Sequence, residues 1–242
     1  MPPIEEMLAS VGISHSRGTS TELLMLSLAL LRRPAWMVAA AVLWLTVVVA
    51  GFAGLAAYDN QPGTAATPHA QWPAGSALTP DRDRPTLVML THPRCTCSRA
   101  SVAELAEVMA RTTRRPKVYV VFMRPGVFPA GWEQTDLWQS AARIPGAVVV
   151  RDDDGAEASR FGAATSGQTM LYDARGQLVF SGGITGARGH AGDNNGRASL
   201  LAALNHDTTH QPVTPVFGCP LFGSGDEHDH DHTHEAGSRH DG

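Results

Sequence analysis

Residues 85–122 read PTLVMLTHPRCTCSRASVAELAEVMARTTRRPKVYVVF, and their pattern indicates the architecture of the domain. It opens with a compact apolar run of strand length (85–90) and closes with a second one (117–122). Between them, apolar residues recur at helical spacing over 98–115. A strand, a helix and a further strand in this order predict a parallel sheet covered by a helix.

The predicted helix is amphipathic. Its apolar positions are Val102, Leu105, Ala106 and Met109, and its charged positions on the other side are Glu104, Glu107 and Arg111. We therefore expect one side of the helix to pack on the sheet and the charged side to face away from it.

The sequence after residue 122 continues to alternate. The expected elements are a helix at 132–143, a buried strand at 146–150, a short helical turn at 152–162, a hairpin at 168–183 and a closing helix at 197–205. Alternation predicts a parallel core, and the hairpin adds an antiparallel edge. The expected fold class is thus α/β with a mixed central sheet, in one domain spanning residues 85–206.

Two local signals fix the ends of these elements. In the hairpin, Asp173 can start the turn and Gly176 can take its left-handed position. Asp193 or Asn194 is suited to cap the closing helix.

An uncharged, apolar segment at 35–58 precedes this domain, with Arg32 and Arg33 before it and Asp59 after it. As a helix it would reach about 36 Å, enough to cross a hydrocarbon core of about 30 Å. The positive-inside rule places residues 1–34 in the cytoplasm and the rest outside. A cleaved signal peptide is the alternative, but the apolar run exceeds the usual ~7–15 residues.

The remaining segments differ in composition from the domain. Residues 59–84, rich in Pro, Ala, Gly and Thr, are predicted to be a linker. Residues 207–224 contain Cys219 in an apolar, proline-framed stretch, predicted to dock on the domain, and 225–242 form a His/Asp-rich tail predicted to be disordered. A net charge of −4 without a basic stripe excludes nucleic acid as a partner.

The chemistry of the domain centres on Cys95 and Cys97, two of the chain's three cysteines. They fall at the predicted strand-to-helix corner, where free amide groups and the helix dipole favour a thiolate. Arg94 and Arg99 add positive charge nearby. Thiolates attack disulfides and bind soft metals, so a redox pair and a metal site both remain open.

These features resemble the thioredoxin superfamily, notably its membrane-tethered TlpA- or ResA-like members. Three blocks resemble the exported RedB-type proteins more specifically, namely HPRCTCSRAS, FGAATSGQTMLYDARGQLVFSGGITGARGHAGDNNGR and VFGCPL, within residues 85–222. The resemblance implies a thioredoxin-like three-layer sandwich, preceded here by one transmembrane helix. It also implies thiol–disulfide exchange with exported protein thiols or disulfides.

Two features depart from the superfamily pattern. One residue, not two, separates Cys95 from Cys97, and a disulfide across so short a loop is expected to be strained. The usual proline before the hairpin is absent from the stretch 165–168. Cys219 can compensate by resolving a disulfide formed at Cys95 or Cys97, or by serving as a third metal ligand.

The leading hypothesis is therefore a single-pass protein of the bacterial inner membrane whose periplasmic domain is a thiol–disulfide oxidoreductase. Cys95 would attack, either Cys97 or Cys219 would resolve, and no cofactor would be needed. The alternative is a copper- or zinc-binding module that serves a metal-receiving protein. Its expected ligands are Cys95, Cys97, Cys219 and His190, with a metal-collecting tail at His228, His230, His232 and His234. A third possibility is a catalytically silent interaction domain.

Overall fold

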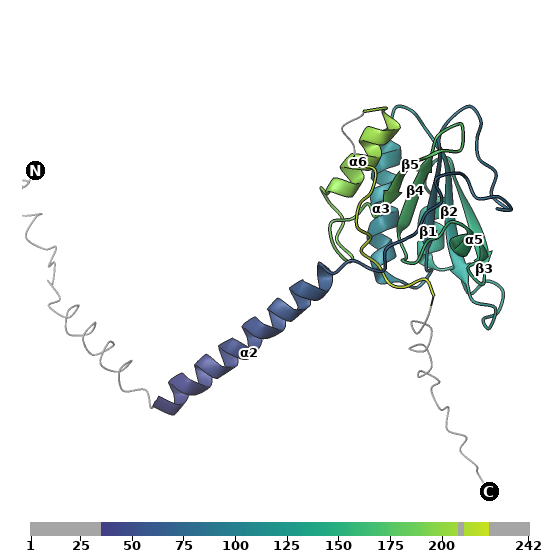
Figure 1. Ribbon diagram of the computed structural model, residues 1–242. Coiled ribbons are helices and arrows are strands. Elements are labelled where there is room, and N and C mark those ends of the chain that lie inside the picture. The colour runs from purple at the N-terminus through teal and green to yellow at the C-terminus, as the bar shows by residue number, and fades with distance from the viewer. Residues whose placement is uncertain (1–34, 208–210, 223–242) are drawn as a thin grey trace, which may run out of the picture. The chain divides into compact units, whose positions relative to one another are not determined.

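The computed structural model describes residues 35–207 and 211–222 (Figure 1). Helix α2 (Ala35–Asp59) has 25 residues, and among the described residues it is the one helix long and apolar enough to cross a membrane. The predicted apolar helix at 35–58 is thus confirmed as a helix. Residues 1–34, predicted to be cytoplasmic, lie outside the described residues.

The domain is built on a five-stranded mixed sheet with the order β3-β2-β1-β4-β5. The strands are β1 (Thr86–Thr91), β2 (Lys117–Arg124), β3 (Ala147–Asp153), β4 (Gln168–Tyr172) and β5 (Leu178–Gly182). Strands β1, β2 and β3 run parallel, whereas β4 pairs antiparallel with both β1 and β5. The parallel core with an antiparallel hairpin at one edge therefore has the predicted topology.

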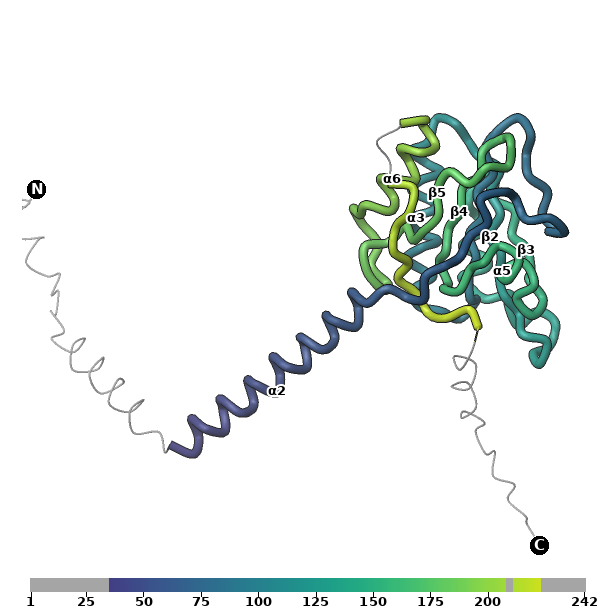
Figure 2. The backbone as a smooth tube through the Cα atoms, in the orientation of Figure 1, coloured from purple at the N-terminus to yellow at the C-terminus, as the bar shows by residue number. Residues whose placement is uncertain are grey.

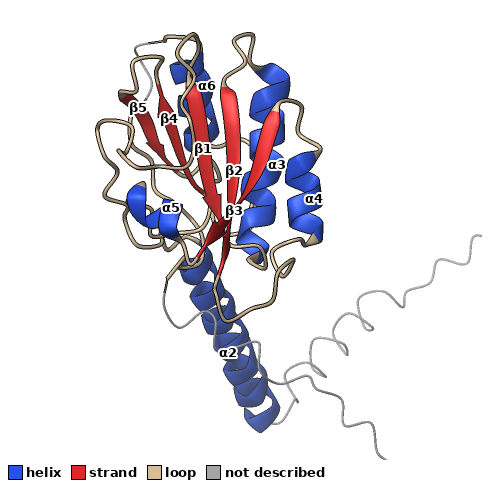
Figure 3. Ribbon diagram, turned by 90° about the vertical axis from the view of Figure 1, so that its right-hand side faces the viewer, coloured by secondary structure: helices blue, strands red, loops and turns tan. Residues whose placement is uncertain are grey.

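Helices cover both faces of this sheet (Figure 3). They are α3 (Thr96–Arg111), α4 (Asp136–Ala142), α5 (Ala156–Arg160) and α6 (Asn195–Leu204). Apolar side chains of α3, α4 and α6 form one core with one face of the sheet, and α5 contributes to a second core on the opposite face. This arrangement confirms the expected thioredoxin-like three-layer sandwich.

Residues 59–84 pack against the domain, whereas their composition predicts only a linker. The Trp72 ring packs edge-on against Phe161 and Tyr172, and Leu78 is buried in the same core. The Trp72 N–H also donates to the Gly176 carbonyl. Figure 2 traces this segment in dark blue across the domain. Dispersed aromatic and apolar residues, not a periodic pattern, hold it there, so the segment shows no helical or strand periodicity.

Short-range sequence signals are confirmed. The Asp173 carbonyl accepts from the Gly176 N–H, and Gly176 has a φ of +77°. At the start of α6, the Asn194 side chain accepts from the Arg197 N–H, so Asn194 is the N-cap.

The predicted burial of the strand at 146–150 is wrong, since Val148 on β3 is 46% exposed. Strand β3 is an edge strand, and its place in the sheet depends on pairing that a local pattern does not show.

The last described segment, residues 211–222, runs back over the domain, and we call it the C-terminal strap (yellow in Figure 2). Val213 pairs in parallel with Ser181 of β5, which anchors the beginning of the strap. Val216 and Leu221 are buried. The strap, residues 211–222, thus packs on the domain.

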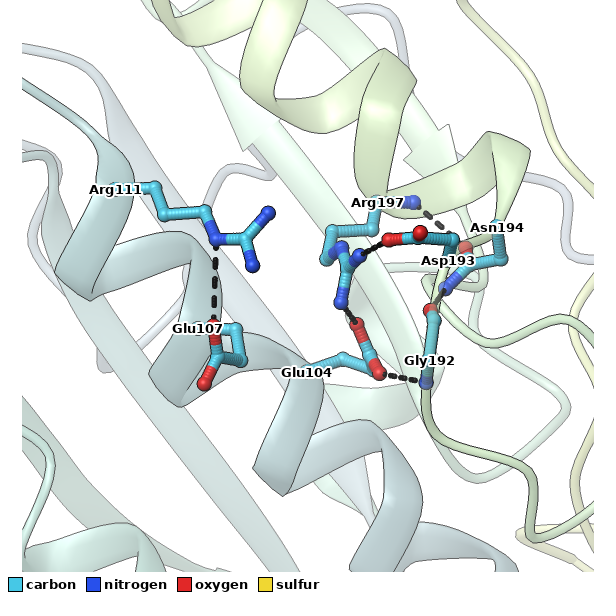
Figure 4. A network of polar contacts seen from close by, with 7 residues as sticks. All are labelled: Glu104, Glu107, Arg111, Gly192, Asp193, Asn194 and Arg197. Atoms are coloured by element: carbon cyan, nitrogen blue, oxygen red, sulfur yellow. Dashed lines mark hydrogen bonds and ion pairs between the residues drawn. The ribbon is translucent and has the colours of Figure 1, made fainter.

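A buried ion pair joins α3 to α6 (Figure 4). The Arg197 Nη1 donates to Glu104 Oε2 at 2.7 Å, and the Gly192 N–H donates to Glu104 Oε1 at 2.5 Å. Arg197 also pairs with Asp193. Glu104 is 2% exposed, so the expectation that it shares the outer face of the helix with Glu107 is wrong. Its partner lies far along the chain, on a helix whose packing the local periodicity does not encode.

We predict that the two glutamates of α3 differ strongly in their effect on stability. Glu104→Ala leaves the buried Arg197 guanidinium without its main partner, which should lower the free energy of unfolding by about 3–5 kcal/mol. Glu107→Ala removes only an exposed pair with Arg111 and should cost less than about 1 kcal/mol. Urea unfolding of the full chain in detergent measures both, and equal losses would contradict the assignment.

Candidate thiol site

Cys95 and Cys97 lie at the junction between β1 and α3. Helix α3 begins at Thr96, two residues earlier than the pattern predicts, so Cys95 is its N-cap residue and Cys97 lies in its first turn. The Ser98 N–H donates to the Cys95 carbonyl at 3.1 Å, which closes this first turn. Cys95 is buried and Cys97 is partly exposed. The predicted corner position is confirmed.

The C-terminal strap brings Cys219 to this corner. The Cys95 Sγ and Cys219 Sγ atoms are 3.1 Å apart, although 124 positions separate the two residues in the chain. The sulfur of Cys97 joins them, and all three Sγ atoms lie within 4.8 Å of one another. The structure thus places the three cysteines in one cluster.

Main-chain pairing holds the strap in this position. The Ser166 N–H donates to the Cys219 carbonyl at 2.8 Å, and the Leu221 N–H donates to the Ala164 carbonyl at 2.9 Å. At Gly218 a Cβ atom would collide with the Ser166 carbonyl oxygen. Glycine at this position therefore permits the close approach of the two backbones.

Two buried serines connect this pairing to the cysteine corner. The hydroxyl oxygens of Ser98 and Ser166 are 2.6 Å apart, and the Ser166 hydroxyl also accepts from the His92 N–H at 2.7 Å. Ser166 therefore contacts the strap through its backbone and the corner through its side chain. The sequence marks the stretch 165–168 by its lack of proline and by its place in a block that resembles RedB-type proteins, but nothing in it points to a contact of Ser166 with the cysteine corner. The described residues contain no cis peptide bond.

The contacts within the cluster shift the pKa values of the three sulfurs in different directions. A hydrogen bond from the Cys219 thiol lowers the pKa of Cys95 to about 4, against the opposing effect of burial, and Ser98 adds to the lowering. The same hydrogen bond, with burial, raises the pKa of Cys219 well above its usual range. Burial, followed by the charge of Cys95, raises the pKa of Cys97. At neutral pH the cluster therefore holds one thiolate, at Cys95.

An arginine that the sequence did not single out acts on the charges of the cluster. Arg99 forms an exposed ion pair with Asp136, and the Arg94 guanidinium lies 4.9 Å from the centre of the Trp132 ring. Arg188 instead lowers the pKa values of Cys97 and Cys219, although larger causes raise both. It belongs to the glycine-rich loop between β5 and α6, where no pattern of spacing points to the cysteines.

The histidines expected as metal ligands are not part of the cluster. His190 is exposed, and its Nδ1 lies 2.8 Å from the Arg188 carbonyl oxygen. Among the described residues, the group that could hold a metal contains the three cysteines alone. The predicted tail ligands at 228–234 lie outside the described residues.

Comparison with known proteins does not assign a family. No family model and no curated protein matches the chain. A hypothetical protein from Sinorhizobium meliloti 1021 is 21% identical, with a TM-score of 0.47 over 67% of this chain and 97% of that one. An uncharacterized conserved protein from Geobacillus kaustophilus is 17% identical, with a TM-score of 0.48 over 69% of this chain and 94% of that one.

A third similar structure is a secreted disulfide oxidoreductase from Mycobacterium tuberculosis that is homologous to Escherichia coli DsbE. It is 15% identical, with a TM-score of 0.36 over 51% of this chain and 81% of that one. Likenesses of this size assign no function to the chain. The thioredoxin-like fold rests on the strand order and the helix layers described above.

The hydrogen bond from the Cys219 thiol to Cys95 leads to a testable prediction about pH. In the reduced protein, thiolate absorbance near 240 nm should report one thiolate that is lost as the pH falls through about 4. Cys219→Ala removes the donor and should raise this transition, whereas Cys97→Ala should leave it low. A rise with Cys97→Ala alone would contradict the assignment.

The same shift sets the sign of a stability change. The unfolded chain keeps the Cys95 proton up to the ordinary value of 9.0, so it binds more protons than the folded chain between about pH 4 and 9. The contribution of Cys95 to stability is therefore fully present above pH 9 and is lost as the pH falls towards 4.

Proposed function

We propose that the chain is a membrane-anchored thiol–disulfide oxidoreductase that acts on exported protein thiols or disulfides. The observation that carries this proposal is the 3.1 Å separation between the sulfurs of Cys95 and Cys219. A thiolate with a second thiol in contact is the arrangement that disulfide exchange requires. No cofactor takes part in this chemistry.

The reaction balances with these groups alone. The Cys95 thiolate attacks one sulfur of a substrate disulfide, forms a mixed disulfide and releases the other substrate sulfur as a thiolate. Cys219 then gives its proton to solvent, and its thiolate attacks Cys95 Sγ, which releases the second substrate thiolate. The substrate disulfide is reduced and a Cys95–Cys219 disulfide forms; the reverse sequence oxidises a substrate dithiol.

Cys219 fits the resolving role better than Cys97 does. Its sulfur is already in contact with Cys95, and the strap approaches from a separate part of the chain. A bond to Cys97 would close a loop with one intervening residue across the start of α3, where the geometry of a disulfide is hard to meet. Cys97 therefore remains a neighbour of the exchanging pair.

The proposal also covers the location of the protein in the cell and its relationship to RedB-type proteins. Helix α2 would anchor the chain in the bacterial inner membrane with the domain in the periplasm, because Arg32 and Arg33 precede it. The three blocks that resemble RedB-type proteins contain Cys95, Ser166 and Cys219. These residues meet at one site, which supports the proposed relationship to that group.

The experiment starts from the full chain recovered with membranes and extracted in detergent; recovery in the soluble fraction would contradict the anchor. Reduced protein is mixed with glutathione disulfide, and its adducts are followed by intact mass. We expect the wild type to pass through a one-glutathione adduct to an intramolecular disulfide. Cys219→Ser should stop at the adduct, and Cys95→Ser should react at least about 100-fold more slowly, since it lacks the low-pKa thiolate.

Cys97→Ser is the matched control, because it removes a sulfur from the same cluster and should leave both steps in place. Unchanged reactivity in Cys95→Ser would contradict the redox proposal. A wild-type protein that forms no intramolecular disulfide would favour a catalytically silent domain.

A second function, binding of copper or zinc, is favoured by one observation: the three sulfurs lie within 4.8 Å of one another. Two sulfurs bound to one zinc ion at about 2.3 Å each are separated by about 3.8 Å, so small movements would suffice for shared coordination. Three thiolates suit a soft ion such as Cu(I). A metal-receiving protein would then be the partner.

Metal binding makes a distinct prediction. If the cluster is a metal site, a variant truncated after residue 222 should bind one Cu(I) per chain in native mass spectrometry. Each single Cys→Ser variant should lose it, including Cys97→Ser, which the redox proposal spares. Binding that disappears with the tail alone would assign the metal to the tail and exclude the cluster.

A further inference from the structure

Arg188 lies where three segments of the domain meet. Its Nη1 donates to the Gly218 carbonyl at 2.5 Å, and its Nε donates to the Gln61 carbonyl at 3.2 Å. Its backbone N–H donates to the Asp59 carbonyl at 2.9 Å, and its guanidinium lies 4.9 Å from the centre of the Tyr58 ring. The side chain is therefore held on one side by residues 58–61 and bonds the strap on the other.

Arg188 bonds the strap at the residue next to Cys219. Gly218 immediately precedes Cys219, whose own carbonyl accepts from the Ser166 N–H. Two hydrogen bonds on neighbouring peptide groups, from Arg188 and from Ser166, thus fix the backbone that carries the Cys219 sulfur. A change in either bond moves this sulfur relative to Cys95, which lies on a different segment.

Contacts with α3 and α6 hold the loop that carries Arg188. Gly192, four residues further along, donates to the buried Glu104, which in turn binds Arg197 of α6 (Figure 4). Since Glu104 belongs to α3, the helix that starts at the cysteine corner also anchors the loop that reaches the strap. Arg188 thereby has a defined position with respect to Cys95.

From this geometry we infer that Arg188 is a positioning residue for the exchange chemistry: it clamps the strap so that Cys219 stays within reach of Cys95. The inference rests on the proposed function, and it assigns to Arg188 the second step, in which Cys219 attacks Cys95 of the mixed disulfide. The first step, attack by Cys95 on an external disulfide, does not need the clamp. Exchange within a chain is fast when the two groups are held in place, and it slows when one is released.

The test measures the two steps separately in the full chain in detergent. With glutathione disulfide as the probe, Arg188→Gln should leave the rate of the first adduct within about twofold of wild type. It should slow the conversion of the adduct to the Cys95–Cys219 disulfide roughly fivefold, the size expected for one lost hydrogen bond to the strap. The equilibrium between that disulfide and glutathione should shift towards the reduced protein by a similar factor.

Arg188→Lys and Arg175→Gln complete the design. Lysine can bond Gly218 but cannot also reach Gln61 with the geometry of a guanidinium, so its effect should fall between those of wild type and Arg188→Gln. Arg175 is exposed in the turn between β4 and β5, and its replacement should change neither step. If Arg188→Gln does not fold, Arg188→Lys decides by the same two rates.

A lower melting temperature with an unchanged glutathione equilibrium would reduce Arg188 to a structural role and overturn the inference. Equal slowing of both steps would overturn it as well. Failure of the proposed function is distinguishable, because the wild type itself would then form no Cys95–Cys219 disulfide.

Discussion

The pairing of residues 164–166 with residues 219–221 is the contact on which the site depends. Without it, Cys95 and Cys97 are two thiols at a helix start, and Cys219 is a distant residue near the end of the chain. Two main-chain hydrogen bonds, Ser166 to Cys219 and Leu221 to Ala164, bring the third sulfur to the corner. The depressed pKa of Cys95 follows from this contact, because its largest cause is the thiol that the strap delivers.

Further contacts hold the two paired segments in place. Ser166 connects the strap to the corner through its hydroxyl, and Arg188 holds the strap from the other side. The buried pair of Glu104 and Arg197 joins α3 to α6 and fixes the intervening loop. Removing one partner of a buried ion pair is costly, so the loop depends on both Glu104 and Arg197. The chemistry thus rests on contacts between segments that are far apart in the sequence.

That distinction explains what the sequence could predict. The strand-to-helix corner, the turn from Asp173 to Gly176 and the Asn194 cap depend on neighbouring residues, and each was predictable. The parallel core and the antiparallel hairpin followed from the alternation of elements, but the edge position of β3 did not. The burial of Glu104 and the position of Arg188 depend on partners in other segments, which composition and periodicity do not reveal. Docking of the Cys219 segment was expected, but the sequence left open whether Cys219 would contact Cys95 or Cys97. The packing of residues 59–84 also depends on partners in other segments, so it was not predicted from composition.

The most direct test of this account is the disulfide connectivity of the oxidised full chain. After mild oxidation and alkylation of free thiols at low pH, trypsin releases residues 95–99 as one peptide that contains both Cys95 and Cys97. We expect this peptide to be linked through Cys95 to the peptide that contains Cys219, with Cys97 alkylated. A disulfide between Cys95 and Cys97, with Cys219 alkylated, would contradict it.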